Sequence, residues 1–184
     1  MGQDKASIII DGKSLLQRTC LIAKKAGFQP VVVRRPQQLL PRDLAPWAIV
    51  IEDAAPAGEG PLAGLEAALR AGAIRHQDAL IVCPCDLPGL RVEDIAWLWQ
   101  QRCTLTGDRR AFIPRYQQKA QPLFALYSPG LGPVIKRSRR AGVRSLKRLL
   151  ARIRHGSGML PPRHRTAALD ADTPADLCGR RVFD

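Results

Sequence analysis

The sequence lacks the features that would mark a membrane or secreted protein. No apolar run approaches the roughly 18 residues that a bilayer-spanning helix needs. The first residues, Met-Gly-Gln-Asp-Lys, contain no apolar core of the kind that secretory signals carry. Hydrophobic residues make up 46% and charged residues 24% of the 184 positions, which is typical of soluble globular proteins. We therefore expect one cytoplasmic domain over residues 1–184, without a membrane association.

Cysteine is too scarce and too irregularly spaced for a disulfide scaffold or a zinc site. The five cysteines are an odd number, and only Cys83 and Cys85 lie close together. A structural zinc site usually draws its four ligands from two such pairs. We therefore expect buried, reduced thiols.

Acidic residues are missing from one long stretch of the chain. Residues 109–169 contain 15 basic and no acidic residues, whereas the remainder holds 14 basic and 16 acidic ones. Such a block attracts phosphates or other polyanions. Aromatic residues, on which single-stranded bases stack, are few in this stretch. A solvated basic face and a phosphate-bearing small molecule both remain open, and a specific nucleic acid is the least favoured partner.

Apolar runs alternate with helical patterns along the chain, which predicts an α/β fold. The fold is an open, mostly parallel sheet with helices on both faces. Strands are predicted at 30–33, 47–51, 79–83, 111–114, 122–127 and near 169, and helices at 14–26, 61–71, 92–99, 144–154 and after 174. The unbroken apolar runs at 30–33, 47–51 and 79–83 suit strands buried on both faces. Ligands bind at the carboxyl ends of the strands in such folds, so the residues that follow strands are the first candidates.

Charged residues follow three of the predicted strands, namely Arg34 and Arg35, Glu52 and Asp53, and Asp86. Asp86 follows the buried run at 79–83, and Pro84 and Pro88 stiffen its turn. A carboxylate there suits a hard divalent cation that also binds phosphate oxygens, although capping of the next helix is equally compatible. Arg34 and Asp53 follow the two preceding strands. Near the N-terminus, Lys5 could neutralise phosphate charge, and a solvated lysine is the alternative.

Two further segments could approach a ligand. Gly60, Pro61, Leu62 and Gly64 open a predicted helix, where glycines allow close approach and the helix N-terminus favours anions. Asp170 and Asp172 precede Pro174, which suits a first helical turn. Either aspartate could cap that helix or face Asp86 across the site.

These segments, in this order, resemble the nucleotidyltransferases of molybdenum cofactor synthesis, and most closely the guanylyltransferases among them. The matching segments are MGQDKA, DGKSLLQR, VVV, ED, GEGPLAGL, PCDLP, QPLFALY and DADTPADL, which together span essentially the whole chain. The resemblance implies a nucleotide-binding α/β fold and a Mg²⁺-dependent transfer of GMP from GTP to molybdopterin, with release of pyrophosphate. It also implies a molybdoenzyme or its chaperone as a possible further partner.

The resemblance implies a role for each candidate residue. Lys5 and Asp86 would be catalytic, Lys5 on the nucleotide phosphates and Asp86 on Mg²⁺. The nucleotide would also be contacted by Arg34, by Asp53 and by the turn formed by Gly60, Pro61, Leu62 and Gly64. Asp170 and Asp172 would lie on the side of the molybdenum cofactor or of a second metal.

The chain departs from that family at its first residues. Members usually carry a strand and a glycine-rich loop of the form L-A-G-G-x-S-x-R just ahead of M-G-x-D-K, and this chain begins at that Met. We therefore expect the first, central strand of the sheet to be missing and its neighbours to have unpaired edges. The alternatives are a cytidylyl- or sugar-phosphate nucleotidyltransferase, or a truncated, noncatalytic binding protein with a basic surface.

Overall fold

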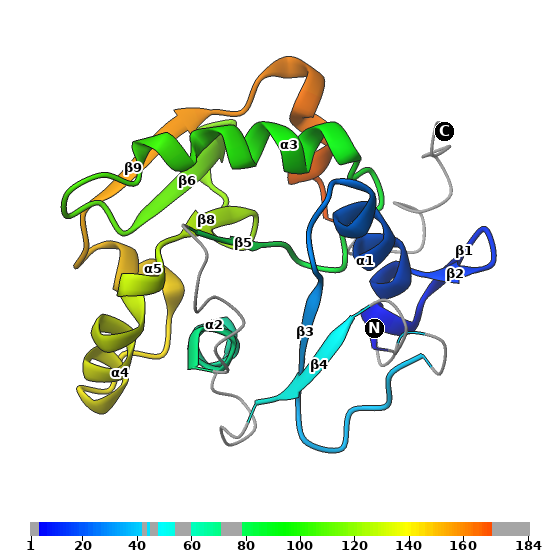
Figure 1. Cartoon of the computed structure of the whole chain (residues 1–184), viewed down its shortest axis with the longest axis horizontal. Coiled ribbons are helices and arrows are strands. Elements are labelled where there is room, and N and C mark those ends of the chain that lie inside the picture. Colours follow the sequence, from blue (N-terminus) through cyan, green and yellow to red (C-terminus); the bar gives the residue numbers. More distant parts are fainter. Residues whose placement is uncertain (1–3, 42–43, 45–47, 54–59, 71–78, 171–184) are drawn as a thin grey trace.

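The computed structural model describes residues 4–41, 44, 48–53, 60–70 and 79–170, and it shows an α/β architecture (Figure 1). The helices are α1 Leu15–Lys25, α2 Pro61–Arg70, α3 Val92–Gln100, α4 Gly132–Arg140 and α5 Leu146–Leu150. The strands are β1 Ile9–Ile10, β2 Lys13–Ser14, β3 Val31–Arg34, β4 Ile49–Glu52, β5 Leu80–Val82, β6 Ala111–Tyr116, β7 Lys119–Ala120, β8 Ala125–Tyr127 and β9 His155–Met159. Short 3₁₀ helices include η1 Lys5–Ser7, η3 Gln101–Thr104, η4 Pro129–Leu131 and η5 Pro162–Ala168. In this part of the chain no helix has the length and apolar character needed to cross a membrane.

The N-terminal part contains helix α1 and a two-stranded parallel sheet. Ser14 caps α1: its side chain accepts from the backbone N–H of Gln17 at 3.1 Å, and the Gln17 side chain accepts from the Ser14 N–H at 2.7 Å. Gly27 has φ +86°, a left-handed conformation that favours glycine, and it follows the end of the helix as predicted. Strands β3 and β4 then pair in parallel, with Val31 opposite Ile49 and Arg34 opposite Glu52.

The second sheet carries the larger hydrophobic core. Its strand order is β5-β8-β6-β7, and β9 pairs with β6 in parallel, whereas the other pairs are antiparallel. Helices α2, α4 and α5 pack on one cluster of buried residues, and α3 packs on the other. Leu98, Leu126, Ile135 and Leu149 are fully buried. The α/β class with strands and covering helices is therefore confirmed.

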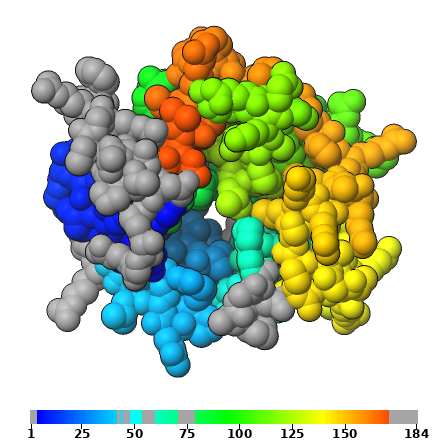
Figure 2. All heavy atoms as spheres, turned by 180° about the vertical axis from the view of Figure 1, so that it is seen from behind, coloured from blue at the N-terminus to red at the C-terminus, as the bar shows by residue number. Residues whose placement is uncertain are grey.

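The two sheets are not joined. In the described part of the chain, β3 pairs only with β4, and β5 pairs only with β8. A cavity of about 850 Å³ lies between the two sheets, and its lining includes residues of strands β3 and β5 and of helices α1, α2 and α3. Figure 2 shows a hollow at the centre of the opposite face.

The cavity is partly open to solvent. Water therefore fills the space between the two sheets in solution.

Several predicted elements differ from the structure. The strand at 47–51 was expected to be buried on both faces, but Ile49 is 50% and Val50 is 39% exposed, because β4 has only β3 beside it among the described residues. All three residues of β5 are half-buried, because the strand faces the cavity. The helix predicted over 144–154 is limited to α5, although its leucines are buried as expected.

The C-terminal part differs more. The residues near Leu169 form no strand; Leu169 follows η5, and residues after 170 lie outside the described part. Strand β9, helix α4 and η5 were not predicted. The strand β9 reads His-Gly-Ser-Gly-Met, which has no apolar alternation, and its glycines lie under Phe112. A Cβ at Gly156 or Gly158 would come within 3.3 Å of that ring, so the close packing favours glycine.

Candidate functional site

The carboxyl ends of β3 and β5 meet at η1. Lys5 Nζ lies 3.2 Å from Asp86 Oδ2, and Asp86 follows β5 by a short turn. Asp4, the residue ahead of Lys5, accepts a hydrogen bond from Gln38 Nε2 at 2.5 Å and lies 3.9 Å from the guanidinium of Arg35. Both partners of Asp4 follow β3. The structure therefore brings the predicted pair Lys5 and Asp86 together, at the edge where ligands bind in α/β folds.

The side chains of Lys5 and Asp86 suit an anionic ligand that binds together with a metal ion. The side chains of Lys5 and Asp86 are 32% and 22% exposed, so both remain accessible. Among the described residues, no three His, Cys, Asp or Glu side chains cluster to hold a metal. The carboxylate of Asp86 nevertheless fits Mg²⁺, because proteins often bind this ion through one or two carboxylates, with substrate phosphates and water as the other ligands.

The cysteines beside this edge are free. Cys20, Cys83, Cys85 and the exposed Cys103 form no disulfide, and the exposure of Cys103 corrects the expectation that the thiols are buried. Burial, followed by the charges of Asp86 and Asp4, raises the pKa of the Cys85 thiol to about 11. Burial also raises the pKa of Cys20 to about 11. These thiols are protonated at neutral pH and are poor nucleophiles or metal ligands.

Arg34 and Asp53 lie at the adjacent strand ends. Arg34 Nη2 donates to Glu52 Oε2 at 2.9 Å, and both side chains are well exposed. The backbone N–H of Asp53 donates to the Arg34 carbonyl at 2.8 Å, which extends the β3–β4 ladder by one step. Asp53 therefore follows β4 as expected, whereas Arg34 is the last residue of β3 and has an acidic neighbour in Glu52.

The Gly-Pro turn opens helix α2 as predicted. Gly60 has φ +70° and is exposed, and Pro61 occupies the first helical position. The side chain of Leu62 is fully buried in the core, so only its backbone could face a ligand. A Cβ on Gly64 would meet Val33 Cγ1 at an ordinary 3.8 Å, so packing alone does not require glycine there.

The acidic pair at the C-terminal end is only partly described. Asp170 is exposed, and Asp172 lies outside the described residues. The role expected for them from the family resemblance therefore stays a prediction.

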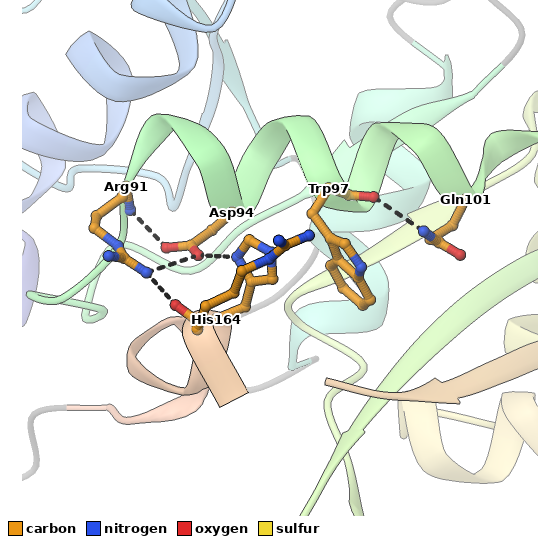
Figure 3. A network of polar contacts seen from close by, with 6 residues as sticks. Arg91, Asp94, Trp97, Gln101 and His164 are labelled. Atoms are coloured by element: carbon orange, nitrogen blue, oxygen red, sulfur yellow. Dashed lines mark hydrogen bonds and ion pairs between the residues drawn. The ribbon is translucent and has the colours of Figure 1, made fainter. Parts of the chain in front are cut away.

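Sequence reasoning missed a buried polar network between α3 and η5 (Figure 3). His164 Nδ1 lies 2.6 Å from Asp94 Oδ1, and the two side chains are 3% and 0% exposed. The Arg91 N–H donates to Asp94 Oδ2 at 2.8 Å, and His164 stacks on Trp97 with ring centres 5.4 Å apart. A substrate cannot reach side chains that are this deeply buried. We therefore infer that the network has a structural role and holds η5 against α3. Its one sequence signal is Asp94 at the third position of a helix, where a side chain can accept from the N-cap N–H.

The basic stretch forms exposed surface on α4 and α5, drawn in yellow and light orange in Figure 2. Arg139 on α4 forms an ion pair with Glu66 on α2, which ties this surface to the core. The exposed basic residues of α4 and α5 are Lys136, Arg137, Arg140, Lys147 and Arg148.

An α/β domain with a lysine–aspartate pair at its strand ends and a Gly-Pro turn opening a neighbouring helix is typical of nucleotide-binding proteins. Residues 1–157 match the family model described as the MobA-like NTP transferase domain. The chain therefore belongs to this family of nucleotidyltransferases, as its sequence motifs predicted.

Individual relatives agree with this assignment. The chain is 32% identical to a probable molybdenum cofactor guanylyltransferase of Opitutus terrae over 82% of this chain and 71% of that protein. It is also 32% identical to a protein of the same description from Synechococcus elongatus, over 96% and 89% of the two chains. The crystal structure of molybdopterin-guanine dinucleotide biosynthesis protein A from Archaeoglobus fulgidus superimposes with a TM-score of 0.70 at 23% identity, covering 96% of this chain and 88% of that one.

Proposed function

We propose that this protein transfers GMP from GTP to the phosphate of molybdopterin, with release of pyrophosphate. In this reaction an oxygen of the molybdopterin phosphate bonds to the α-phosphorus of GTP. The bond between the α- and β-phosphates breaks, and pyrophosphate leaves with its electron pair. The contact between Lys5 of η1 and Asp86, which follows the carboxyl end of β5, is the observation that carries the proposal. The descriptions of the relatives support the choice of GTP and molybdopterin.

The residues of this chain would act mainly by position and charge. Lys5 would bind the phosphates, whose negative charge its ammonium group offsets. Asp86 would hold Mg²⁺, which when bound neutralises phosphate charge in the transition state. The backbone from Gly60 to Gly64 would lie against the nucleotide, with Arg34 and Asp53 at the neighbouring strand ends. Little covalent chemistry is asked of the protein, because orientation and charge neutralisation lower the barrier.

Two features support the proposed location in the cell and the proposed partners. The free cysteines are typical of a reducing compartment, which agrees with a cytoplasmic location. The exposed basic helices α4 and α5 suit an anionic pterin, or an acidic face of a molybdoenzyme or its chaperone.

The test compares Asp86→Asn with the unchanged protein. Purified protein is given GTP, molybdopterin and Mg²⁺, and pyrophosphate release is measured together with calorimetric binding of GTP. We expect Asp86→Asn to reduce turnover at least about 100-fold, because a lost transition-state contact costs about 3 kcal/mol. The control is Asp108→Asn, since Asp108 is 65% exposed and contacts only the exposed Arg154 among the interactions described.

Two outcomes would contradict the proposal. Turnover of Asp86→Asn within a few-fold of the unchanged protein would remove Asp86 from the site. Faster turnover or tighter binding with CTP than with GTP would assign the protein to the cytidylyl alternative. The same assays are also run on a variant with an apolar strand and a glycine-rich turn fused ahead of Met1.

A further inference from the structure

The segment that carries Asp86 belongs to no helix or strand. Strand β5 and helix α3 flank residues 83–91, which we call the Asp86 loop. No ladder or helical hydrogen bonds hold the backbone of this loop in place. The elements that pack on the loop must therefore fix the position of the Asp86 carboxylate.

Helix η5 packs on this loop through apolar side chains. Leu87 and Leu90 are 6% and 1% exposed, although Asp86 beside them is only half-buried. Both leucines belong to the same buried cluster as Ala167 of η5, which is 0% exposed. The loop is therefore anchored on η5 from the residue after Asp86 onward.

Gly89 meets η5 with no room for a side chain. A Cβ at residue 89 would come within 2.8 Å of Thr166 Cβ and within 3.3 Å of the Thr166 carbonyl oxygen. The φ angle of Gly89 lies outside the left-handed region, so its backbone conformation does not require glycine. The close packing on Thr166 is what requires glycine at this position.

Polar contacts tie the end of the loop to the same helix (Figure 3). Arg91 Nη2 donates to the carbonyl of Arg163 at the start of η5. The Arg91 N–H donates to Asp94 in the first turn of α3, and the other carboxylate oxygen of Asp94 contacts His164 of η5. Helix η5 therefore holds both the Asp86 loop and the start of the helix that follows it.

We propose that η5 positions Asp86, and that Gly89 and Thr166 form the contact that sets the place of the loop. A Cβ at residue 89 would push the loop away from η5 and would move Asp86 out of the place where it lies 3.2 Å from Lys5. The inference rests on the proposed function, in which Asp86 holds the metal ion that binds with the nucleotide. A misplacement of about 1 Å in such a group can lower activity about 100-fold.

The test fills the space at residue 89 and then makes room for the added atom. Gly89→Ala places a Cβ against Thr166, and Thr166→Gly removes the Cβ and Cγ2 atoms that it would meet. The double variant should therefore restore most of the fit. Gly132→Ala is the matched control, because a Cβ there would meet Leu69 Cβ at an ordinary 4.0 Å. Leu150→Ala, in the hydrophobic cluster around α4 and α5, reports the effect of lower stability alone.

Two measurements on the 184-residue protein need no turnover. Hydrogen exchange of the backbone amides follows the opening of residues 86–91. Electron paramagnetic resonance of Mn²⁺, which suits the same oxygen ligands as Mg²⁺, follows the affinity of the protein for Mn²⁺ together with GTP. Asp86→Asn and the single variant Thr166→Gly are measured in parallel.

We expect Gly89→Ala to speed the exchange of residues 86–91 and to weaken binding of Mn²⁺ with GTP, each at least about tenfold. The double variant with Thr166→Gly should recover most of both losses. Gly132→Ala and Leu150→Ala should leave the affinity for Mn²⁺ with GTP unchanged, although Leu150→Ala lowers the thermal midpoint.

The results that would overturn the positioning role are distinct from those that would overturn the proposed function. Unchanged exchange in Gly89→Ala, no recovery in the double variant, or an equal loss of affinity in Leu150→Ala would overturn the positioning role. The same holds if Gly89→Ala binds Mn²⁺ with GTP normally while Asp86→Asn does not. Normal binding by Asp86→Asn would instead contradict the proposed function, and the inference would fail with it.

Discussion

Replacing His164 by Ala should destabilise the protein through the buried Asp94 carboxylate. Arg163 Nε donates to His164 Nε2 at 3.0 Å, so Nε2 accepts and Nδ1 carries the proton donated to Asp94 Oδ1. Without the imidazole, Oδ1 keeps only the guanidinium of Arg91 at 3.7 Å, which is beyond hydrogen-bonding distance. The stacking with Trp97 is lost as well. Removing one partner of a buried polar pair costs about 3–5 kcal/mol, a large share of the roughly 5–15 kcal/mol that stabilises a domain.

The effect is measured by urea and thermal denaturation. For a domain of this size, each kcal/mol lowers the thermal midpoint by about 2–4 °C, so we expect a decrease of about 6–20 °C. His155→Ala is the matched control, because His155 is exposed and its replacement should change stability by less than about 0.5 kcal/mol. Replacing Asp94 and His164 together should cost less than the sum of the two single changes, since the pair is coupled. A loss below about 1 kcal/mol for His164→Ala would refute the interpretation that this network holds η5 on α3.

Three further predictions concern ligands and thiols. Calorimetry should show that the chain binds GTP at least about 100-fold more weakly than a variant with an apolar strand and a glycine-rich turn fused ahead of Met1. The reason is that each added hydrogen bond to phosphate contributes about 1.5–3 kcal/mol. Equal affinities of the two proteins for GTP would contradict this prediction. Duplex DNA and single-stranded RNA should bind only weakly and with strong salt dependence, since the basic stretch has few aromatic residues, and sequence-selective binding at physiological salt would be the opposite result. Maleimide at pH 8 should label Cys103 well before the buried Cys20 and the half-buried Cys85, because their raised pKa of about 11 leaves about one thiolate in a thousand. Labelling of Cys20 and Cys85 should rise as the pH approaches 11. Equal rates for all three thiols at pH 8 would show that Cys20 and Cys85 are accessible and ionised.

Local patterns were enough to predict most elements near the site. Helix α1 follows from its apolar spacing, the Ser14 cap and Gly27, all of which act within a few residues. The valines of β3 and the Gly-Pro start of α2 are equally local signals. Lys5 and Asp86 could also be proposed from their own surroundings, a lysine three positions after Gly2 and a carboxylate on a stiff turn after a strand. Assigning a functional role to either residue also required the family resemblance.

Burial and pairing depended on residues far apart in the chain. Asp94 was on the helix predicted over 92–99, but its burial requires His164, which is 70 positions away. The strand β9 carries no apolar alternation and is held by its parallel ladder with β6 and by the packing of Phe112 on its glycines. Ile49 and Val50 look like core residues and are exposed, because a strand is buried only where neighbouring elements cover it.

The sequence by itself determined the class of the fold, the family and the charged residues available for nucleotide binding, because these depend on composition, local spacing and the order of motifs. The tertiary structure alone decided that Lys5 and Asp86, 81 positions apart, come within 3.2 Å. It also decided that β3 and β5 face each other across a cavity and do not share a ladder. The physical reason is that strand edges and buried charges are satisfied by whatever the folded chain places beside them, and those neighbours come from distant parts of the sequence.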